Sequence, residues 1–134
     1  MYPVTTKILY VDDSPTTLEE LKNELTAMGF DNAEPAVDGK EALEKILEAA
    51  KKGDPFKLII SDWEMPNLSG IDLLNAVRSN KEIPQAPFIF LTKEADMTNV
   101  WKAIDSGVSS YIVKPLAPGV LKKKMEDVFK KFKA

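Results

Sequence analysis

Short apolar runs alternate with amphipathic segments along the chain, and this alternation predicts its secondary structure. Apolar runs of only a few residues, bounded by polar or turn-forming residues, predict strands. The predicted strands span residues 7–11, 33–37, 58–61, 87–91 and 111–113. The uninterrupted apolar runs at 58–60 and 88–91 are typical of parallel strands that are buried on both faces.

The amphipathic segments predict helices, several of which have recognisable ends. Ser14 is a favoured N-cap, Pro15 a favoured first residue and Gly29 a favoured stop for the first helix. Asp38 and Glu41 have capping-box spacing at the start of the second. The other three are predicted to begin near Ser69, Met97 and Pro118, and the fourth to end at residue 106. The apolar positions at helical spacing are Leu18, Leu21, Leu25 and Met28, then Leu43, Ile46 and Leu47, then Ile71, Leu74 and Val77, and finally Val120, Leu121, Met125, Val128 and Phe132.

Five strands that are each followed by a helix predict an α/β fold. We expect a doubly wound, five-stranded parallel sheet with five helices and right-handed crossovers. The length of 134 residues suits a single domain over 1–134, with its core at about 7–132.

Composition and charge narrow the possible partners. The hydrophobic fraction of 44% and the charged fraction of 29% are ordinary for a globular protein. A net charge of −3 gives no indication of nucleic acid or of an anionic membrane. No apolar run approaches the ~20 residues of a membrane span, and the first residues contain no signal core, so we expect a cytoplasmic protein. The lysines at 122–124 and 130–131 are most simply explained as a solvated helix face.

Cysteine and histidine are both absent from the sequence. Without cysteine, disulfides, thiol nucleophiles and thiolate metal sites are excluded. Without histidine, Ser-His-Asp triads, histidine-based zinc sites and phosphohistidine carriers are excluded. Reactive chemistry therefore depends on carboxylates, hydroxyls and lysines.

Polar residues stand at the carboxyl ends of four predicted strands, namely Asp12-Asp13, Asp62, Thr92 and Lys114. Ligands of open parallel sheets bind outside these ends, so we expect the side chains to meet in one cleft. Crowded carboxylates repel one another, and a divalent cation relieves the repulsion. Oxygen ligands favour magnesium, manganese or calcium, and a site with few protein ligands suits magnesium. The lysine and the hydroxyl could then bind phosphoryl oxygens, which leaves one carboxylate as a nucleophile towards phosphorus.

Each of these residues also has a structural interpretation. Asp12 and Asp13 could serve the N-terminus of the first helix, where acidic residues are favourable. Thr92 is a common kind of strand terminus, and an isolated Lys114 would most often be a solvated lysine. Tyr111 could be no more than a half-buried aromatic residue.

The chain resembles the receiver domain of two-component response regulators in the residues at its strand ends. In chain order these residues are Asp12-Asp13, Asp62, Thr92 and Lys114-Pro115. The stretch DWEMPNLSG at 62–70 and the chain length are most similar to the single-domain chemotaxis type. The resemblance extends from about residue 7 to residue 132 and implies a flavodoxin-like strand order of 2-1-3-4-5.

The resemblance implies a phosphorylation site with a bound metal ion. Asp62 would accept a phosphoryl group from a partner histidine kinase. Mg²⁺ would be held by Asp12, Asp13, Asp62 and the main-chain carbonyl of Glu64. The chemistry would act on the protein itself, by phosphoryl transfer and autodephosphorylation, so the protein would not be an enzyme with a separate substrate.

The resemblance also implies a switch and an output surface. Thr92 would bond a phosphoryl oxygen, and Tyr111 would change its rotamer with it. Lys114 would pair with the phosphoryl group, and the Lys114–Pro115 peptide bond would be cis. The face formed by the fourth helix, the fifth strand and the fifth helix would bind a downstream target, for example the flagellar motor switch. We expect a monomer.

Two positions depart from the common family pattern. Lys93 follows Thr92, where many members have a small residue. A long cation there would either cover part of the site or screen the phosphoryl charge. Glu64 places an acid two residues after Asp62, where it would repel an attacking anion or orient water. We expect Glu64, Lys93 and the adjacent Glu94 to set the lifetime of the acyl phosphate.

Three other functions remain open at this point. The chain could be a receiver domain excised from a longer regulator. It could be an aspartyl-phosphate-forming phosphohydrolase with Glu64 as general acid, although such an enzyme would usually need a substrate-covering cap, for which no chain is left. A flavodoxin-like cofactor binder is less favoured, because Asp12-Asp13 would repel a cofactor phosphate at the first turn.

Overall fold

The computed structural model describes residues 2–63, 65, 67–92, 108–113, 117 and 119–133, without the side chains of 131–133. The strands are β1 (Ile8–Val11), β2 (Ala33–Ala36), β3 (Leu58–Asp62), β4 (Phe88–Thr92) and β5 (Ser110–Val113). The helices are α1 (Pro15–Ala27), α2 (Gly39–Lys51), α3 (Gly70–Ser79) and α5 (Val120–Lys133). The predicted helix at 97–106 lies outside the described residues. The observed elements agree with the predicted ones to within one or two residues at each end.

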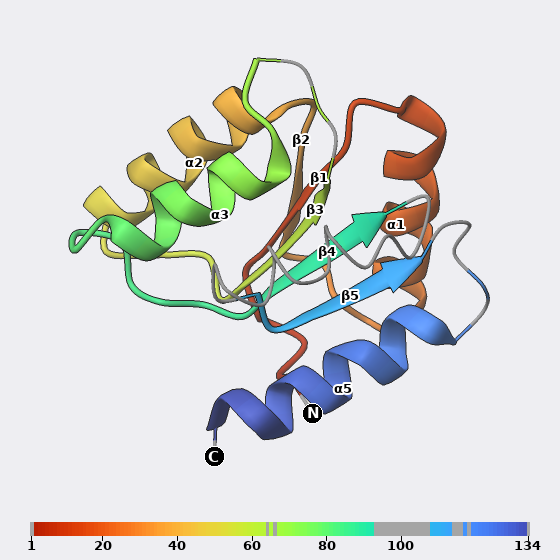
Figure 1. Cartoon of the computed structure of the whole chain (residues 1–134). Coiled ribbons are helices and arrows are strands. Elements are labelled where there is room, and N and C mark those ends of the chain that lie inside the picture. Colours follow the sequence, from red (N-terminus) through yellow and green to blue (C-terminus); the bar gives the residue numbers. More distant parts are fainter. Residues whose placement is uncertain are drawn as a thin grey trace.

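The strands form one parallel sheet in the order β2-β1-β3-β4-β5 (Figure 1). This order confirms the expected flavodoxin-like topology. Every residue of β1 and β3 is buried. In β4 every residue is buried except the last, Thr92, which is half-buried. Continuous apolar runs therefore form the three inner strands, as expected for a sheet that is covered on both faces.

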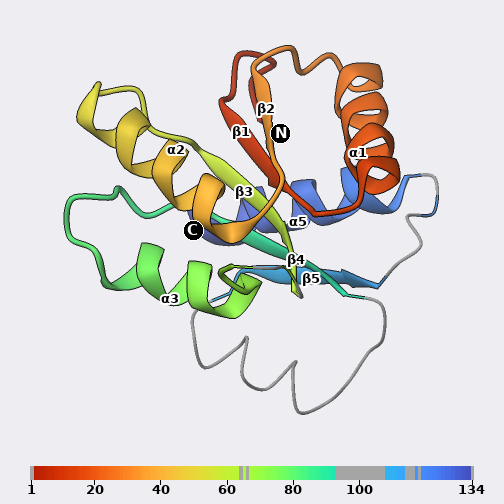
Figure 2. The ribbon, with the colours of Figure 1, turned by 90° about the horizontal axis from the view of Figure 1, so that it is seen from above.

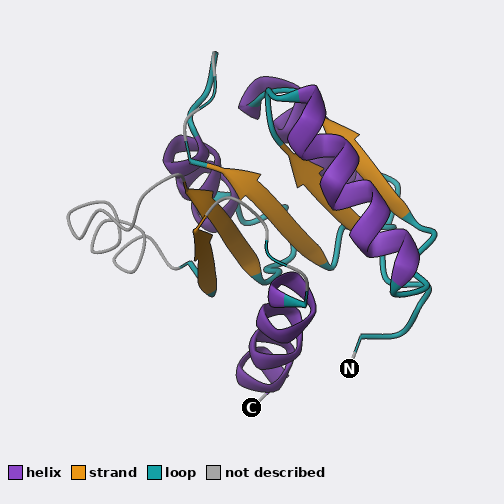
Figure 3. Cartoon of the chain, turned by 90° about the vertical axis from the view of Figure 1, so that its right-hand side faces the viewer, coloured by secondary structure: helices purple, strands orange, loops and turns teal. Residues whose placement is uncertain are grey.

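Helices cover the sheet on both faces (Figures 2 and 3). Leu9, Ile59 and Phe90 pack with residues of α2 and α3 in one core. Their neighbours along the strands, among them Ile8 and Ile60, pack with α1 and α5 in the other. This alternation follows from the two-residue period of a strand, which points successive side chains to opposite faces.

The predicted helix ends are confirmed where the structure describes them. The Ser14 hydroxyl accepts a hydrogen bond from Thr17 N at 3.4 Å, and Asp38 Oδ1 accepts one from Glu41 N at 2.8 Å. Gly29 follows α1 with φ of 92°, a left-handed conformation that favours glycine.

The predicted buried face of α2 needs a correction. Its buried residues include Ala42, Ile46 and Ala49, whereas Leu43 and Leu47 are only partly buried at the edge of the core. The small alanines face the interior because α2 packs closely against both the sheet and α3. Within the described part of the chain, no helix combines the length and apolarity that crossing a membrane requires.

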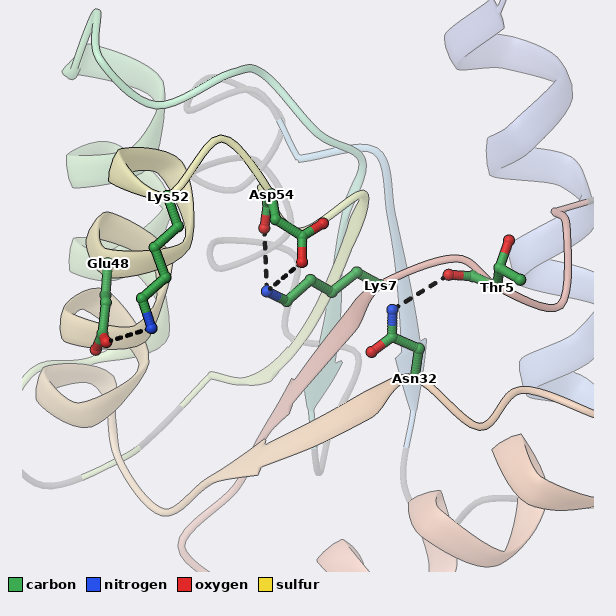
Figure 4. A network of polar contacts seen from close by, with 6 residues as sticks. All are labelled: Thr5, Lys7, Asn32, Glu48, Lys52 and Asp54. Atoms are coloured by element: carbon green, nitrogen blue, oxygen red, sulfur yellow. Dashed lines mark hydrogen bonds and ion pairs between the residues drawn. The ribbon is translucent and has the colours of Figure 1, made fainter.

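Polar contacts join the segments that precede β1, β2 and β3, at the amino ends of these strands (Figure 4). Lys7 Nζ lies 3.0 Å from the Asp54 carbonyl oxygen and 3.2 Å from its carboxylate. Asn32 Nδ2 donates to the Thr5 carbonyl at 3.2 Å. A cavity of ≈ 540 Å³ opens at this edge, and Tyr2 is among its lining residues. The candidate chemistry predicted from the sequence lies at the opposite edge, where the strands end.

Candidate functional site

Three aspartates meet where β1 and β3 end. Asp12 and Asp13 directly follow β1, and Asp62 is the last residue of β3, the neighbouring strand. Each carboxylate offers an oxygen, and these oxygens all lie within 4.8 Å of one another. Asp12 is fully buried and Asp62 is 6% exposed, while Asp13 is exposed to solvent. The structure therefore brings together the carboxylates that the sequence placed in one cleft.

Asp12 also orders the start of α1. Its backbone N–H donates to the Ala36 carbonyl at 3.1 Å, which continues the pairing of β1 with β2 beyond the strand end. Its Oδ1 accepts a hydrogen bond from Ser14 N at 2.8 Å, and Ser14 in turn caps α1. The structural interpretation of Asp12 and the metal interpretation are therefore both compatible with its position.

The charge of the cluster explains what could bind there. Three carboxylates at this distance repel one another, and the burial of two of them weakens the screening by water. The donor set consists of oxygen atoms alone, which fits a hard divalent cation. One exposed and two buried carboxylates leave a face open to solvent, as a cation that keeps some of its water requires.

The segment that follows Asp62 is closely tied to the sheet. Trp63 N donates to the Leu91 carbonyl at 2.9 Å, and Gly70 N donates to the Trp63 carbonyl at 2.9 Å. The buried Ser61 hydroxyl donates to the Asp62 carbonyl at 3.0 Å. A Cβ on Gly70 would lie 2.2 Å from that same Asp62 carbonyl oxygen, so only glycine permits this approach. These contacts fix the backbone around Asp62.

Thr92 lies on β4, the neighbour of β3, and Tyr111 lies on β5, the next strand beyond it. Thr92 ends β4 and is half-buried, in register with Val113 of β5. Tyr111 is 37% exposed, and its ring centroid lies 5.6 Å from Lys124 Nζ of α5. Both residues occupy the strands on which the sequence placed them. Their switch roles remain predictions.

Several predicted site residues lie outside the described residues. They are Glu64, Lys93, Glu94, Lys114 and Pro115. The metal, lifetime, phosphoryl-binding and cis-peptide roles assigned to them therefore stay predictions.

One contact near the site was missed in the sequence. Asn67 Nδ2 donates to Asp38 Oδ2 at 2.8 Å, across 29 positions of the chain. Asn67 has φ of 70°, the left-handed conformation that asparagine tolerates better than most residues. An asparagine three residues before a glycine in a predicted loop is a weak signal for such a conformation, and nothing local indicates its partner.

Comparison with known proteins identifies a family with which the fold and the acidic cluster both agree. The response regulator receiver domain family matches residues 8–126. Chemotaxis protein CheY-3 of Vibrio cholerae is 40% identical over 125 residues, which cover 93% of this chain and 92% of that protein. The CheY homolog of Campylobacter jejuni is 41% identical over 122 residues, which cover 91% of each chain.

Two solved structures are also similar. Chemotaxis response regulator CheY4 of Vibrio cholerae has a TM-score of 0.82 and 32% identity, over 92% of this chain and 98% of that one. CheY from Borrelia burgdorferi, solved in a complex with CheX, BeF3 and Mg²⁺, has a TM-score of 0.83 and 27% identity. That match covers 92% of this chain and 89% of the other.

The chain belongs to the response regulator receiver domain family, whose members are signalling switches. Its relatives place it among the chemotaxis response regulators of two-component signalling.

Proposed function

We propose that Asp62 accepts a phosphoryl group from a histidine kinase and that the resulting acyl phosphate switches the protein's output surface. The observation that supports this most directly is the cluster of Asp12, Asp13 and Asp62, whose oxygens lie within 4.8 Å of one another at the ends of two adjacent strands. A buried carboxylate beside two others suits nucleophilic attack once their charge is balanced.

In the proposed reaction, an Asp62 carboxylate oxygen forms a bond to phosphorus while the bond from phosphorus to the kinase's histidine nitrogen breaks. The electron pair of the broken bond stays on that nitrogen. Hydrolysis by water later returns Asp62 to its carboxylate and releases inorganic phosphate. The chemistry acts on the protein itself, so no separate substrate is turned over.

Asp12, Asp13 and Asp62 would hold Mg²⁺, with the Glu64 carbonyl as the further ligand that the family resemblance implies. When bound, Mg²⁺ would supply positive charge opposite the phosphoryl oxygens. The all-oxygen donor set supports this choice, as does the Mg²⁺ in the complex of the Borrelia burgdorferi relative. Asp12 would keep its position through its bond to Ser14 N.

The output would depend on β4, β5 and α5. Thr92 would bond a phosphoryl oxygen, and Lys114 would pair with the phosphoryl group. Tyr111, now half-exposed with Lys124 near its ring, would follow Thr92 and change the face of β5 and α5. Phosphorylation would thereby favour one of two arrangements that are both accessible to the free protein. The downstream target would bind this face, and the protein would act as a cytoplasmic monomer.

Intact mass spectrometry tests the proposal. The wild type is incubated with Mg²⁺ and acetyl phosphate, a small phosphodonor, and compared with Asp62→Asn. We expect the mass of one phosphoryl group to be added to the wild type alone, because the amide is a far weaker nucleophile than the carboxylate. Chelation of the metal should abolish the gain.

Asp54→Asn is a matched control, since Asp54 lies at the opposite edge of the sheet. This variant should gain the phosphoryl group as the wild type does. Absence of any gain in the wild type, whether from acetyl phosphate or from a histidine kinase, would overturn the proposal. Continuous turnover of a phosphomonoester would instead favour a phosphohydrolase.

A further inference from the structure

The loop that leaves Asp62 is joined to a second loop by the Asp38–Asn67 contact. Asn67 lies between β3 and α3, whereas Asp38 lies between β2 and α2. The Asn67 amide donates to Asp38 Oδ2 at 2.8 Å. Among the described residues other than glycine, Asn67 alone has a positive φ. Its backbone is therefore held in a conformation that few side chains favour.

Both oxygens of Asp38 have a fixed partner. Oδ1 accepts from Glu41 N at 2.8 Å and so caps α2, while Oδ2 accepts from Asn67. Donation from the Glu41 backbone, then from the Asn67 amide, lowers the pKa of Asp38 below its ordinary value. The carboxylate is therefore ionised at neutral pH, and the hydrogen bond from Asn67 is charge-assisted, which makes it stronger than a bond between neutral groups.

Close backbone packing accompanies this contact. A Cβ on Gly39, the first residue of α2, would lie 2.1 Å from the Leu68 carbonyl oxygen. Two residues after Leu68, a Cβ on Gly70 would lie 2.2 Å from the Asp62 carbonyl oxygen. The chain at residues 67–70 is thus held against α2 and against the end of β3. Along the sequence, Glu64 lies between Asp62 and these residues.

We propose that Asp38 and Asn67 are positioning residues for the metal site, because their contact holds the loop after Asp62 in its metal-binding conformation. This inference rests on the proposed function, which assigns Asp62 and the Glu64 carbonyl to Mg²⁺. Neither Asp38 nor Asn67 belongs to the acidic cluster. Their contact would raise Mg²⁺ affinity by reducing the loop conformations that binding must select.

Two variants remove the contact while they keep the local backbone. Asn67→Gly retains the left-handed conformation but lacks the amide. Asp38→Ser retains a favoured N-cap for α2 but is too short to reach Asn67 as well. Magnesium affinity is measured by titration calorimetry for the wild type, each single variant and the double variant. Thermal unfolding without metal reports any general loss of stability.

We expect each single variant to raise the Mg²⁺ dissociation constant about tenfold, as the loss of a residue that orients metal ligands commonly does. The double variant should bind no more weakly than either single one, because the two changes remove the same contact. Asn32→Gly, which removes an amide hydrogen bond at the opposite edge of the sheet, should leave the constant unchanged.

The outcomes separate this inference from the proposed function. Wild type that does not bind Mg²⁺ would overturn both. Wild-type binding with unchanged constants in the variants would overturn the positioning role alone, even if their melting temperatures fell, since the contact would then be merely structural. Additive effects in the double variant would also overturn it, because independent losses would show that the residues do not act through one contact.

Discussion

At the scale of single residues, Asp12 combines two duties in one carboxylate. It accepts from Ser14 N and so orders the start of α1, and it contributes an oxygen to the cluster with Asp13 and Asp62. The hydrogen bond that orders the start of α1 thereby also holds Asp12 in the acidic cluster. Asp13, which is exposed, is free of this structural constraint, and it is therefore the better position at which to vary the charge of the cluster.

Tyr2 carries a buried hydroxyl group whose hydrogen-bonding capacity is unsatisfied by the described residues. Its ring packs against Phe129 at a centroid distance of 4.7 Å, and its buried hydroxyl has no hydrogen-bond partner among the described residues. Burial raises the pKa of Tyr2 to about 12. The folded state therefore disfavours the tyrosinate form relative to the unfolded chain.

We expect Tyr2→Phe to stabilise the protein by about 1 kcal/mol at neutral pH, because it removes an unsatisfied buried donor and keeps the ring. The wild type should also lose stability as the pH rises from about 10 towards 12, since the unfolded chain releases the tyrosine proton first. Tyr2→Phe should lose less over that range. Urea unfolding at several pH values measures both effects.

Tyr10 acts as an internal reference in this comparison. Its pKa is also raised, by burial and by Glu19, and it is present in both proteins. Part of the alkaline loss should therefore persist in Tyr2→Phe. Lower stability of that variant at neutral pH would show that the hydroxyl has a favourable partner such as ordered water.

At the scale of elements, the first turn of α3 is limited by its approach to β3. Alanine normally stabilises a helix relative to glycine by ~0.5–1 kcal/mol. At Gly70, however, a Cβ would meet the Asp62 carbonyl at 2.2 Å and the Phe90 ring at 2.8 Å. Neither the strand backbone nor a fully buried ring has room to move. The helix therefore begins with a residue that local propensity disfavours.

We expect Gly70→Ala to destabilise the protein by about 2–3 kcal/mol, as overpacking in a dense core does. Gly53→Ala is the control, because Gly53 has φ of 76° but a Cβ there meets nothing within 4 Å. That change should cost only the backbone strain of about 1 kcal/mol. Urea unfolding compares the two, and a Gly70→Ala protein as stable as the wild type would contradict the close contact.

At the scale of the whole molecule, the two ends of the strands differ in their polar residues. Lys7, Asp54 and Asn32 tie the strands together at the amino edge. The carboxyl edge instead concentrates like charges, which oppose folding. A bound cation would reverse that penalty, so the stability of the fold and the occupancy of the site are thermodynamically linked.

We expect Mg²⁺ at about 100 times its dissociation constant to stabilise the fold by about 2.7 kcal/mol. Asp13→Asn should be more stable than the wild type without metal, because repulsion falls, and should lose most of the Mg²⁺ increment. Asp127→Asn, which removes an exposed carboxylate of α5, should retain the increment. Thermal unfolding with and without Mg²⁺ measures the metal-free stability and the Mg²⁺ increment of each protein. Equal increments in all three proteins would indicate non-specific binding.

Much of the fold was predictable because its signals are local. The caps Ser14 and Asp38, the buried runs of β3 and β4, and the aspartates at the strand ends follow from residues close together in the sequence. The strand order came from the family resemblance, since periodicity does not specify which strands pair. Of the apolar positions predicted for α2, Ile46 is buried, but the buried Ala42 and Ala49 were missed because leucines outrank alanines in any pattern of hydrophobicity.

The sequence by itself determined the strands, most of the helices and the identity of the candidate carboxylates, because each depends on residue type and short-range spacing. Only the tertiary structure decided that β1 lies beside β3, which brings Asp12 and Asp62 together. It also decided that Asn67 meets Asp38 and that Gly70 touches the Asp62 carbonyl. These contacts exist because α2 and α3 pack side by side on the sheet, and such packing depends on the shapes of surfaces that are far apart in the chain.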